Sequence, residues 1–200
     1  MLFSQEDRRR QVLLKRVTER DSVFLDQETG LVELGTVRRR YFAPESGVRE
    51  VALAAGGVYY ALFSGEIPFQ FGLGRLGAYT VADYPGRRFP LGLYGRLRLR
   101  AAHAGGLAGL LKDADGQWVN ELVFPTLFVR LELRLREALC RAVDQVNGEG
   151  TWRYELLFPA REQLSRQISR DWFPIFYENG LLLDGRSFEI EGLTAPSVEQ

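Results

Sequence analysis

The spacing of three glycines suggests a chemistry that the surrounding residues do not support. Gly72, Gly74 and Gly77 form a G-x-G-x-x-G pattern, which binds the pyrophosphate of a dinucleotide when the glycines leave a strand and open a helix. The residues after Gly77 are instead strand formers, Ala78–Val81, and they lead into a turn at Tyr84–Gly86. Where the motif requires an acidic residue, roughly twenty positions on, the sequence is basic. We therefore expect a glycine-rich β-turn between two strands, and no bound nucleotide or other cofactor.

The residues that most often perform catalysis stand apart from one another in this sequence. Glu189 and Glu191 fall on one face of a predicted strand, and paired carboxylates can act as acid and base in hydrolysis. His103 has no Ser, Cys or Asp partner at an informative spacing, and Cys140 is the single cysteine. We expect the glutamates to lie beside the arginines of a neighbouring strand, His103 to lie in a turn, and Cys140 to be buried. The sequence predicts no catalytic residue, no metal site and no enzymatic activity.

A predicted strand, Leu93–Arg100, places apolar residues on one face and arginines on the other. Alternate residues of a strand lie about 7 Å apart, so three guanidinium groups in a row could follow the phosphates of a lipid headgroup or a nucleic acid. The same pattern also suits a solvated face or one paired with acidic residues of the protein itself. The candidate face for an anionic ligand or a partner comprises Arg87, Arg88, Arg96, Arg98 and Arg100.

Composition places the chain among ordinary globular proteins and gives it no overall affinity for polyanions. The 200 residues are 46% hydrophobic, which suits one domain with a sizeable core. With 26 basic and 26 acidic residues the formal net charge is zero, which disfavours nucleic acid as a partner. A single cysteine excludes an internal disulfide and agrees with a reducing compartment. Since no apolar run of about eighteen residues is present, and the first residues lack the order of a signal peptide, we expect a cytoplasmic protein.

The N-terminal half is predicted to be mostly strand after one helix. Ser4 can cap a helix that runs to Arg20, with a narrow apolar stripe on one side. Short apolar segments bounded by turn residues then predict strands. These are Val23–Leu25 and Leu31–Val37 about a turn at Glu28–Gly30, a hairpin of Val48–Leu53 and Val58–Phe63, and Phe69–Phe71 and Tyr79–Val81 on either side of the glycine turn.

The C-terminal half is predicted to contain two long helices and two closing strands. Phe128–Leu139 alternates as a strand would, but no Gly or Pro interrupts Thr126–Val146, and that length favours a helix. A short helix, Leu107–Lys112, precedes it. The second long helix is Arg161–Asn179, interrupted near Phe173 and Pro174 and ended by Gly180. The closing strands are Leu181–Leu183 and Phe188–Ile190. Strands, then helices, then a returning strand predict an α+β fold.

An aromatic cluster in the second long helix has two interpretations. Aromatic side chains around a kinked helix usually build a core, but a cluster of this kind can also form the centre of a contact between protomers. The candidate assembly contact comprises Trp172, Phe173, Phe176 and Tyr177.

The order of these segments resembles a known family. The stretch YYALFSGEIPFQFGLGRLGAYTV is similar to the opening of the SPFH domain of stomatin, prohibitin and flotillin, the band 7 superfamily. LYGRLRLRAAHAGGLAGLLKDADGQWVNELVFPTLFVRLELRLREAL looks like that domain's long strand, short helix and packing helix. EQLSRQISRDWFPIFYENGLLLDGRSFEIEGL is similar to its closing unit. The resemblance spans about residues 35 to 193 and is closest to the compact bacterial branch described as virion-core-like.

The resemblance implies a scaffold without chemistry of its own. SPFH domains have a curved, antiparallel-rich sheet with helices packed on it, and they assemble side by side, often at membranes. The implied organisation is a helical extension at residues 1–30, an SPFH-like domain at 31–193 and a flexible tail at 194–200. We expect a homo-oligomer or a protein partner, with peripheral membrane contact left open. The sequence shows no hydrophobic anchor to support membrane residence, and it lacks the long coiled coil through which many relatives multimerise. The alternative is a monomeric module whose arginine face binds an anionic ligand, lipid headgroup or nucleic acid.

Overall fold

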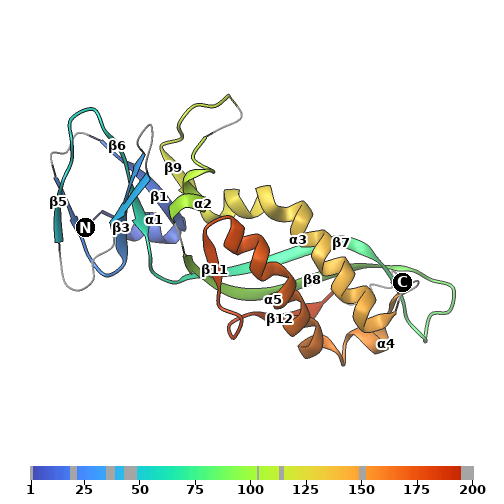
Figure 1. Ribbon diagram of the computed structural model, residues 1–200. Coiled ribbons are helices and arrows are strands. Elements are labelled where there is room, and N and C mark those ends of the chain that lie inside the picture. The colour runs from blue at the N-terminus through green and yellow to red at the C-terminus, as the bar shows by residue number, and fades with distance from the viewer. Residues whose placement is uncertain are drawn as a thin grey trace. The chain divides into compact units, whose positions relative to one another are not determined.

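The computed structural model describes residues 2–18, 22–34, 39–42, 49–102, 104–112, 115–148 and 152–194. In this part of the chain, curled and antiparallel-rich sheets carry helices, which confirms the predicted α+β class (Figure 1). The chain forms two compact units. The first comprises Met1–Ile67, Arg100–Arg130 and Phe176–Leu182, and the second comprises Pro68–Leu99, Leu131–Ile175 and Leu183–Gln200.

The first unit is built on a five-stranded sheet with the order β4-β3-β6-β1-β9 and a separate ribbon of β2 and β5. Every described pairing within it is antiparallel. A buried cluster of Val23, Leu25, Leu31 and Tyr59 joins the ribbon to the sheet. The elements are α1 (Gln5–Arg9), β1 (Val12–Val17), β2 (Ser22–Leu25), β3 (Thr29–Leu34), β4 (Arg39–Phe42), β5 (Arg49–Ala52), β6 (Val58–Phe63), α2 (Ala104–Ala108) and β9 (Glu121–Val123).

The helix predicted for Ser4–Arg20 is wrong beyond its first turns. A capping box between Ser4 and Asp7 starts α1, which ends at Arg9. Burial disfavours the Asp7 carboxylate, but hydrogen bonds from Ser4 and Lys15 outweigh it and lower its pKa. Three consecutive buried residues, Val12–Leu14, then form a strand between β6 and β9. A central strand covered on both faces has no alternation, which is why this apolar run could be mistaken for a helical stripe.

The ribbon corrects a second prediction. The strands Val48–Leu53 and Val58–Phe63 were expected to form a hairpin, but β5 pairs with β2, and β6 pairs with β1 and β3.

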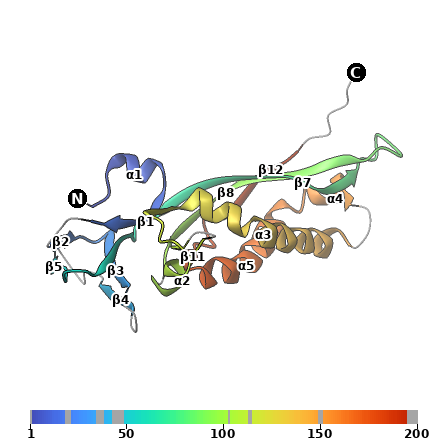
Figure 2. The same cartoon turned by 90° about the horizontal axis from the view of Figure 1, so that it is seen from above.

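The second unit is a sheet with the order β10-β7-β8-β11, in which β12 also pairs with β8. The helices α3 and α5 lie on one side of the long strands β7 and β8 (Figure 2). Some of these elements continue into the first unit at one end. The elements are β7 (Ile67–Thr80), β8 (Phe89–Ala101), α3 (Phe124–Asn147), β10 (Trp152–Arg153), α4 (Tyr154–Leu157), α5 (Arg161–Glu178), β11 (Leu181–Leu183) and β12 (Glu189–Leu193).

An aromatic triad forms the core of the second unit. The Phe71 ring lies 5.1 Å from the Trp172 ring and 5.6 Å from the Phe188 ring, measured between centroids, and Trp172 meets Phe188 edge to face at 5.3 Å. The indole nitrogen of Trp172 donates to the carbonyl of Leu135 at 3.0 Å, which ties α5 to α3. Such rings contribute large buried areas and a preferred geometry.

The glycine-rich segment is not a turn. Gly72, Gly74 and Gly77 lie inside β7, a single strand of 14 residues, and the chain reverses only after Thr80. The prediction that no helix opens after Gly77 is therefore confirmed, and the predicted turn is wrong. Arg75, inside this strand, has a φ of 55°, in the left-handed region that residues other than glycine seldom adopt. A Cβ at Gly72 or Gly74 would meet no atom within 4 Å, so these two positions face open space, whereas a Cβ at Gly77 would approach the Trp152 ring to 2.5 Å.

The helix predictions hold with small shifts. Phe128–Leu139 lies within α3, which confirms helix over strand. The predicted interruption of the second long helix is wrong, because α5 continues through Pro174. Gly180 follows α5 with a φ of 83°, as expected for a left-handed C-cap. The short helix lies a few residues earlier than predicted, at Ala104–Ala108.

Candidate functional site

The predicted arginine face exists, but its first member is already paired. Along β8 the side chains at Arg96, Arg98 and Arg100 are exposed and the alternate positions are buried, as the alternation predicted. β12 lies antiparallel to β8 with Glu189 opposite Arg96. The Arg96 guanidinium lies 2.6 Å from the Glu189 carboxylate and 3.7 Å from that of Glu191. The expectation that the two glutamates neighbour this face is therefore confirmed.

This pairing removes most of the attraction that Arg96 could offer an anionic ligand. The hydrogen bond to Glu189 raises the pKa of Arg96, so the guanidinium keeps its charge beside two carboxylates. One cation between two anions gives this group of three side chains a net negative charge. The two carboxylates are also engaged with that cation, which is a structural role and not the arrangement of an acid and a base around a substrate.

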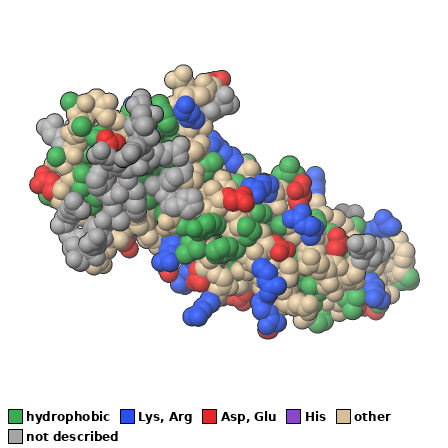
Figure 3. Space-filling view, in the orientation of Figure 1, with side chains coloured by type: hydrophobic (Ala, Val, Ile, Leu, Met, Phe, Trp, Pro, Cys, Tyr) green, Lys and Arg blue, Asp and Glu red, His purple; other side chains and the backbone are tan. Residues whose placement is uncertain are grey.

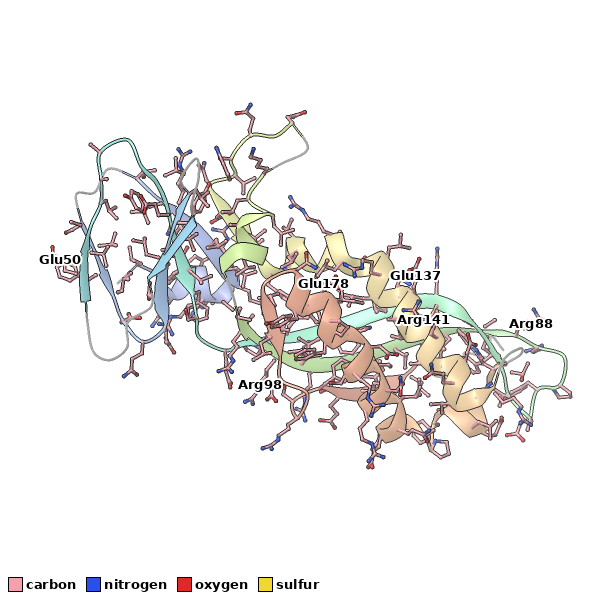
Figure 4. The ribbon with its side chains drawn as sticks, viewed as in Figure 1. Glu50, Arg88, Arg98, Glu137, Arg141 and Glu178 are labelled. Atoms are coloured by element: carbon pink, nitrogen blue, oxygen red, sulfur yellow. The ribbon has the colours of Figure 1, made fainter. Side chains whose placement is uncertain are left out.

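Two of the predicted arginines, Arg87 and Arg88, do not join Arg96 in one site. Arg98 is fixed through its backbone, whose N–H donates to the Ser187 hydroxyl at 2.9 Å. Arg87 and Arg88 belong to the β7–β8 loop, and eight residues of strand separate Arg88 from Arg96, about 26 Å at 3.3 Å per residue. Figure 4 shows Arg88 at that loop and Arg98 well along the sheet. Arg98 and Arg100 continue the exposed face of β8 beyond Arg96.

A shallow cavity of about 430 Å³ lies between the β7–β8 loop and α4 in the second unit. Glu155 closes one side of it, with its carboxylate accepting from the Ala82 N–H at 2.7 Å. That hydrogen bond lowers the pKa of Glu155. Arg153 is the other charged residue of its lining, so the cavity carries no net charge. It is lined by Thr80, Val81, Ala82, Pro85, Gly86, Arg153, Glu155 and Leu156.

The candidate assembly residues of α5 divide between the two sides of the helix. Trp172 and Phe176 are fully buried, so they act in the core as the first interpretation expected. Phe173 and Tyr177 are 41% and 48% exposed and lie one turn apart. The structure therefore keeps two of the four aromatic side chains on the surface. Figure 3 shows apolar side chains gathered over the C-terminal half of α5.

Two arginines outside the predicted face extend the same surface. Arg166 and Arg170 are exposed on α5, and their spacing from Phe173, at i, i+4 and i+7, puts all three on one helix face. Neither arginine forms an ion pair with a described residue. We call Arg166, Arg170 and Phe173 the α5 stripe, and Tyr177 continues it by one turn. The i, i+4, i+7 spacing in the sequence could have predicted that these residues share a helix face. The prediction considered only the aromatic residues of this helix, and it therefore missed the two arginines.

The remaining sequence candidates bring no chemistry together. Cys140 is half-buried on α3, and burial raises the pKa of its thiol. His103 lies outside the described residues. Within the described ranges, no three His, Cys, Asp or Glu side chains cluster as metal ligands would. Among the described helices, none has both the length and the apolar character needed to cross a membrane.

Comparison with known proteins gives no relative from which a function could be transferred. No protein-family model matches the chain, and no curated protein matches it.

Proposed function

We propose that this chain is a non-enzymatic assembly domain that associates with other protein chains, in the first place with copies of itself. The observation that carries the proposal is the outer face of α5, where Phe173 and Tyr177 stay exposed beside arginines. Aromatic and arginine side chains are the types that most often dominate protein–protein contacts. Covering these rings on association would remove apolar surface from water, at about 25 cal/mol per Å².

The SPFH resemblance supports the same proposal at the level of the family. An α+β fold with antiparallel-rich sheets and helices on one side of the long strands agrees with what the resemblance implies for residues 31–193. We propose that the chain is an SPFH-like scaffold of the cytoplasm, which reaches a membrane surface only through a partner. The scaffold role needs no bound cofactor.

The binding-module alternative stays a prediction that the surface of β8 supports less well. It needs an arginine face with spare positive charge, and Arg96 is engaged by Glu189 and Glu191. On α5, Arg166 and Arg170 are exposed, form no ion pair with a described residue and lie next to an aromatic ring.

Light scattering of the purified chain at several concentrations and two salt levels tests the proposal. We expect a mass of several times 22.7 kDa for the wild type, and a fall toward the monomer when Phe173→Ala and Tyr177→Ala are combined. Phe158→Ala is the matched control, because Phe158 is 46% exposed on the same unit as Phe173 but lies off α5. A wild-type chain that stays monomeric at every concentration overturns the proposal, as does equal loss of mass in the control.

A further inference from the structure

The β2–β5 ribbon of the first unit presents a surface of opposite charge to the α5 stripe. Its inner face carries Val23 and Leu25, which are buried in the core. Its outer face carries Phe24, which is 59% exposed, directly opposite Glu50 on the neighbouring strand. Figure 4 shows the Glu50 side chain at the edge of β5. The exposed ring of Phe24 offers apolar surface that a partner could cover.

Among the described residues, Glu50 has no cation of its own. Its carboxylate accepts from the Ser22 hydroxyl at 2.6 Å, and it forms no ion pair with any residue in those ranges. The ribbon therefore exposes one aromatic ring and one anion side by side. The α5 stripe exposes one aromatic ring and two cations, Arg166 and Arg170, that likewise have no ion-pair partner there.

The distance between the aromatic residue and the charged residue is similar on the two surfaces. Residues directly opposite each other in an antiparallel pair, such as Phe24 and Glu50, have Cβ atoms about 4.5–5.5 Å apart. Residues three apart on a helix, such as Arg170 and Phe173, have Cβ atoms about 5–6 Å apart. An aromatic ring and an acidic group on one surface can thus meet an aromatic ring and a guanidinium on the other at the same time.

We propose that the Phe24–Glu50 surface of one copy docks on the α5 stripe of a second copy, with ring against ring and Glu50 beside Arg170. The inference rests on the proposed assembly function and names its contact. Because the two surfaces differ, the contact is heterologous, and repetition produces a ring or an open filament. A symmetric contact of α5 with α5 is disfavoured, since it would bring Arg166 and Arg170 of both copies together.

Mixing two defective variants tests the heterologous contact. The ribbon variant combines Phe24→Ala with Glu50→Ala, and the stripe variant combines Arg170→Ala with Phe173→Ala. All four side chains are exposed, so both variants should fold as the wild type does, which circular dichroism checks. Each variant alone should be monomeric. Their mixture should form a species of twice 22.7 kDa, because each retains the surface that the other lacks.

A charge exchange provides the second measurement. Glu50→Arg alone and Arg170→Glu alone should each lower the assembled mass, and the two together in one chain should restore it. If the mixture stays monomeric and the exchange does not restore assembly, the heterologous contact is wrong. If the wild type assembles and only the stripe variant dissociates, the assembly function stands and this partner surface falls. A monomeric wild type overturns both.

Discussion

Two surfaces of this protein carry arginines at regular spacing, and they differ in what lies beside them. On β8 the alternation of a strand places Arg96 outward, and β12 brings Glu189 and Glu191 against it. On α5 the helical spacing places Arg166 and Arg170 outward, and the neighbouring exposed residue is Phe173. Within the described residues, Arg96 is compensated by two carboxylates of the chain itself, whereas Arg166 and Arg170 have no ion-pair partner. The periodicity of a charged stripe therefore predicts which face of the element it occupies. Whether its charges are free to bind a partner depends on an element far away in sequence.

The largest expected effect is the difference in stability lost when a core residue of α5 and a residue of its outer face are each truncated. Trp172→Ala removes a fully buried indole that packs on Phe71 and Phe188 and bonds to the Leu135 carbonyl. We expect a loss of about 3–5 kcal/mol in the free energy of unfolding, measured by urea denaturation. Phe173→Ala, one residue further on, should change it by less than about 0.5 kcal/mol. Equal losses at the two positions would contradict the assignment of Phe173 to the surface.

The next largest effect is expected from a substitution that displaces β12 and so disrupts the pairing of Glu189 with Arg96. A Cβ at Gly95 would overlap the carbonyl oxygen of Glu189 and approach Phe71 to 2.9 Å. Since the oxygen is backbone, the strand itself must shift, and overpacking of this kind costs about 1–3 kcal/mol. We expect Gly95→Ala to be destabilised by that amount in urea. Gly72→Ala is the matched control, because its Cβ would enter open space, and it should stay close to the wild type.

Local patterns in the sequence predicted most of the second unit. The alternation of Leu93–Arg100 and the uninterrupted apolar face of Phe128–Leu139 each depend on neighbouring residues alone, and both predictions held. The pairing of the acidic strand with Arg96 followed from the idea that opposite charges on strand faces attract. This part of the site was therefore predictable from residue types and strand alternation.

The failures came where a local signal had two meanings. Val12–Leu14 is apolar without alternation, which suits a buried central strand as well as a helix. Gly72, Gly74 and Gly77 can form a turn, yet they also fit a strand in which the first two face open space and Gly77 packs against the Trp152 ring. The pairing of β5 with β2 joins segments that are distant in sequence, and such register depends on the whole core. The exposure of Phe173 beside a buried Trp172 likewise depends on which side of α5 meets the sheet.

The smallest expected effect concerns the difference between Arg96, which is paired with carboxylates, and Arg170, which has no ion-pair partner among the described residues. Arg96→Gln and Glu189→Gln, made singly and together, form a double-mutant cycle for the exposed pair. We expect a small favourable coupling in the free energy of unfolding at low salt. It should vanish at about 1 M salt, where the screening length falls to about 3 Å. Arg170→Gln has no ion-pair partner among the described residues, so it should leave the unfolding free energy unchanged and alter only the assembled mass. A loss of folding stability in Arg170→Gln would show that the cation is compensated inside the chain, and the contrast between the surfaces would disappear.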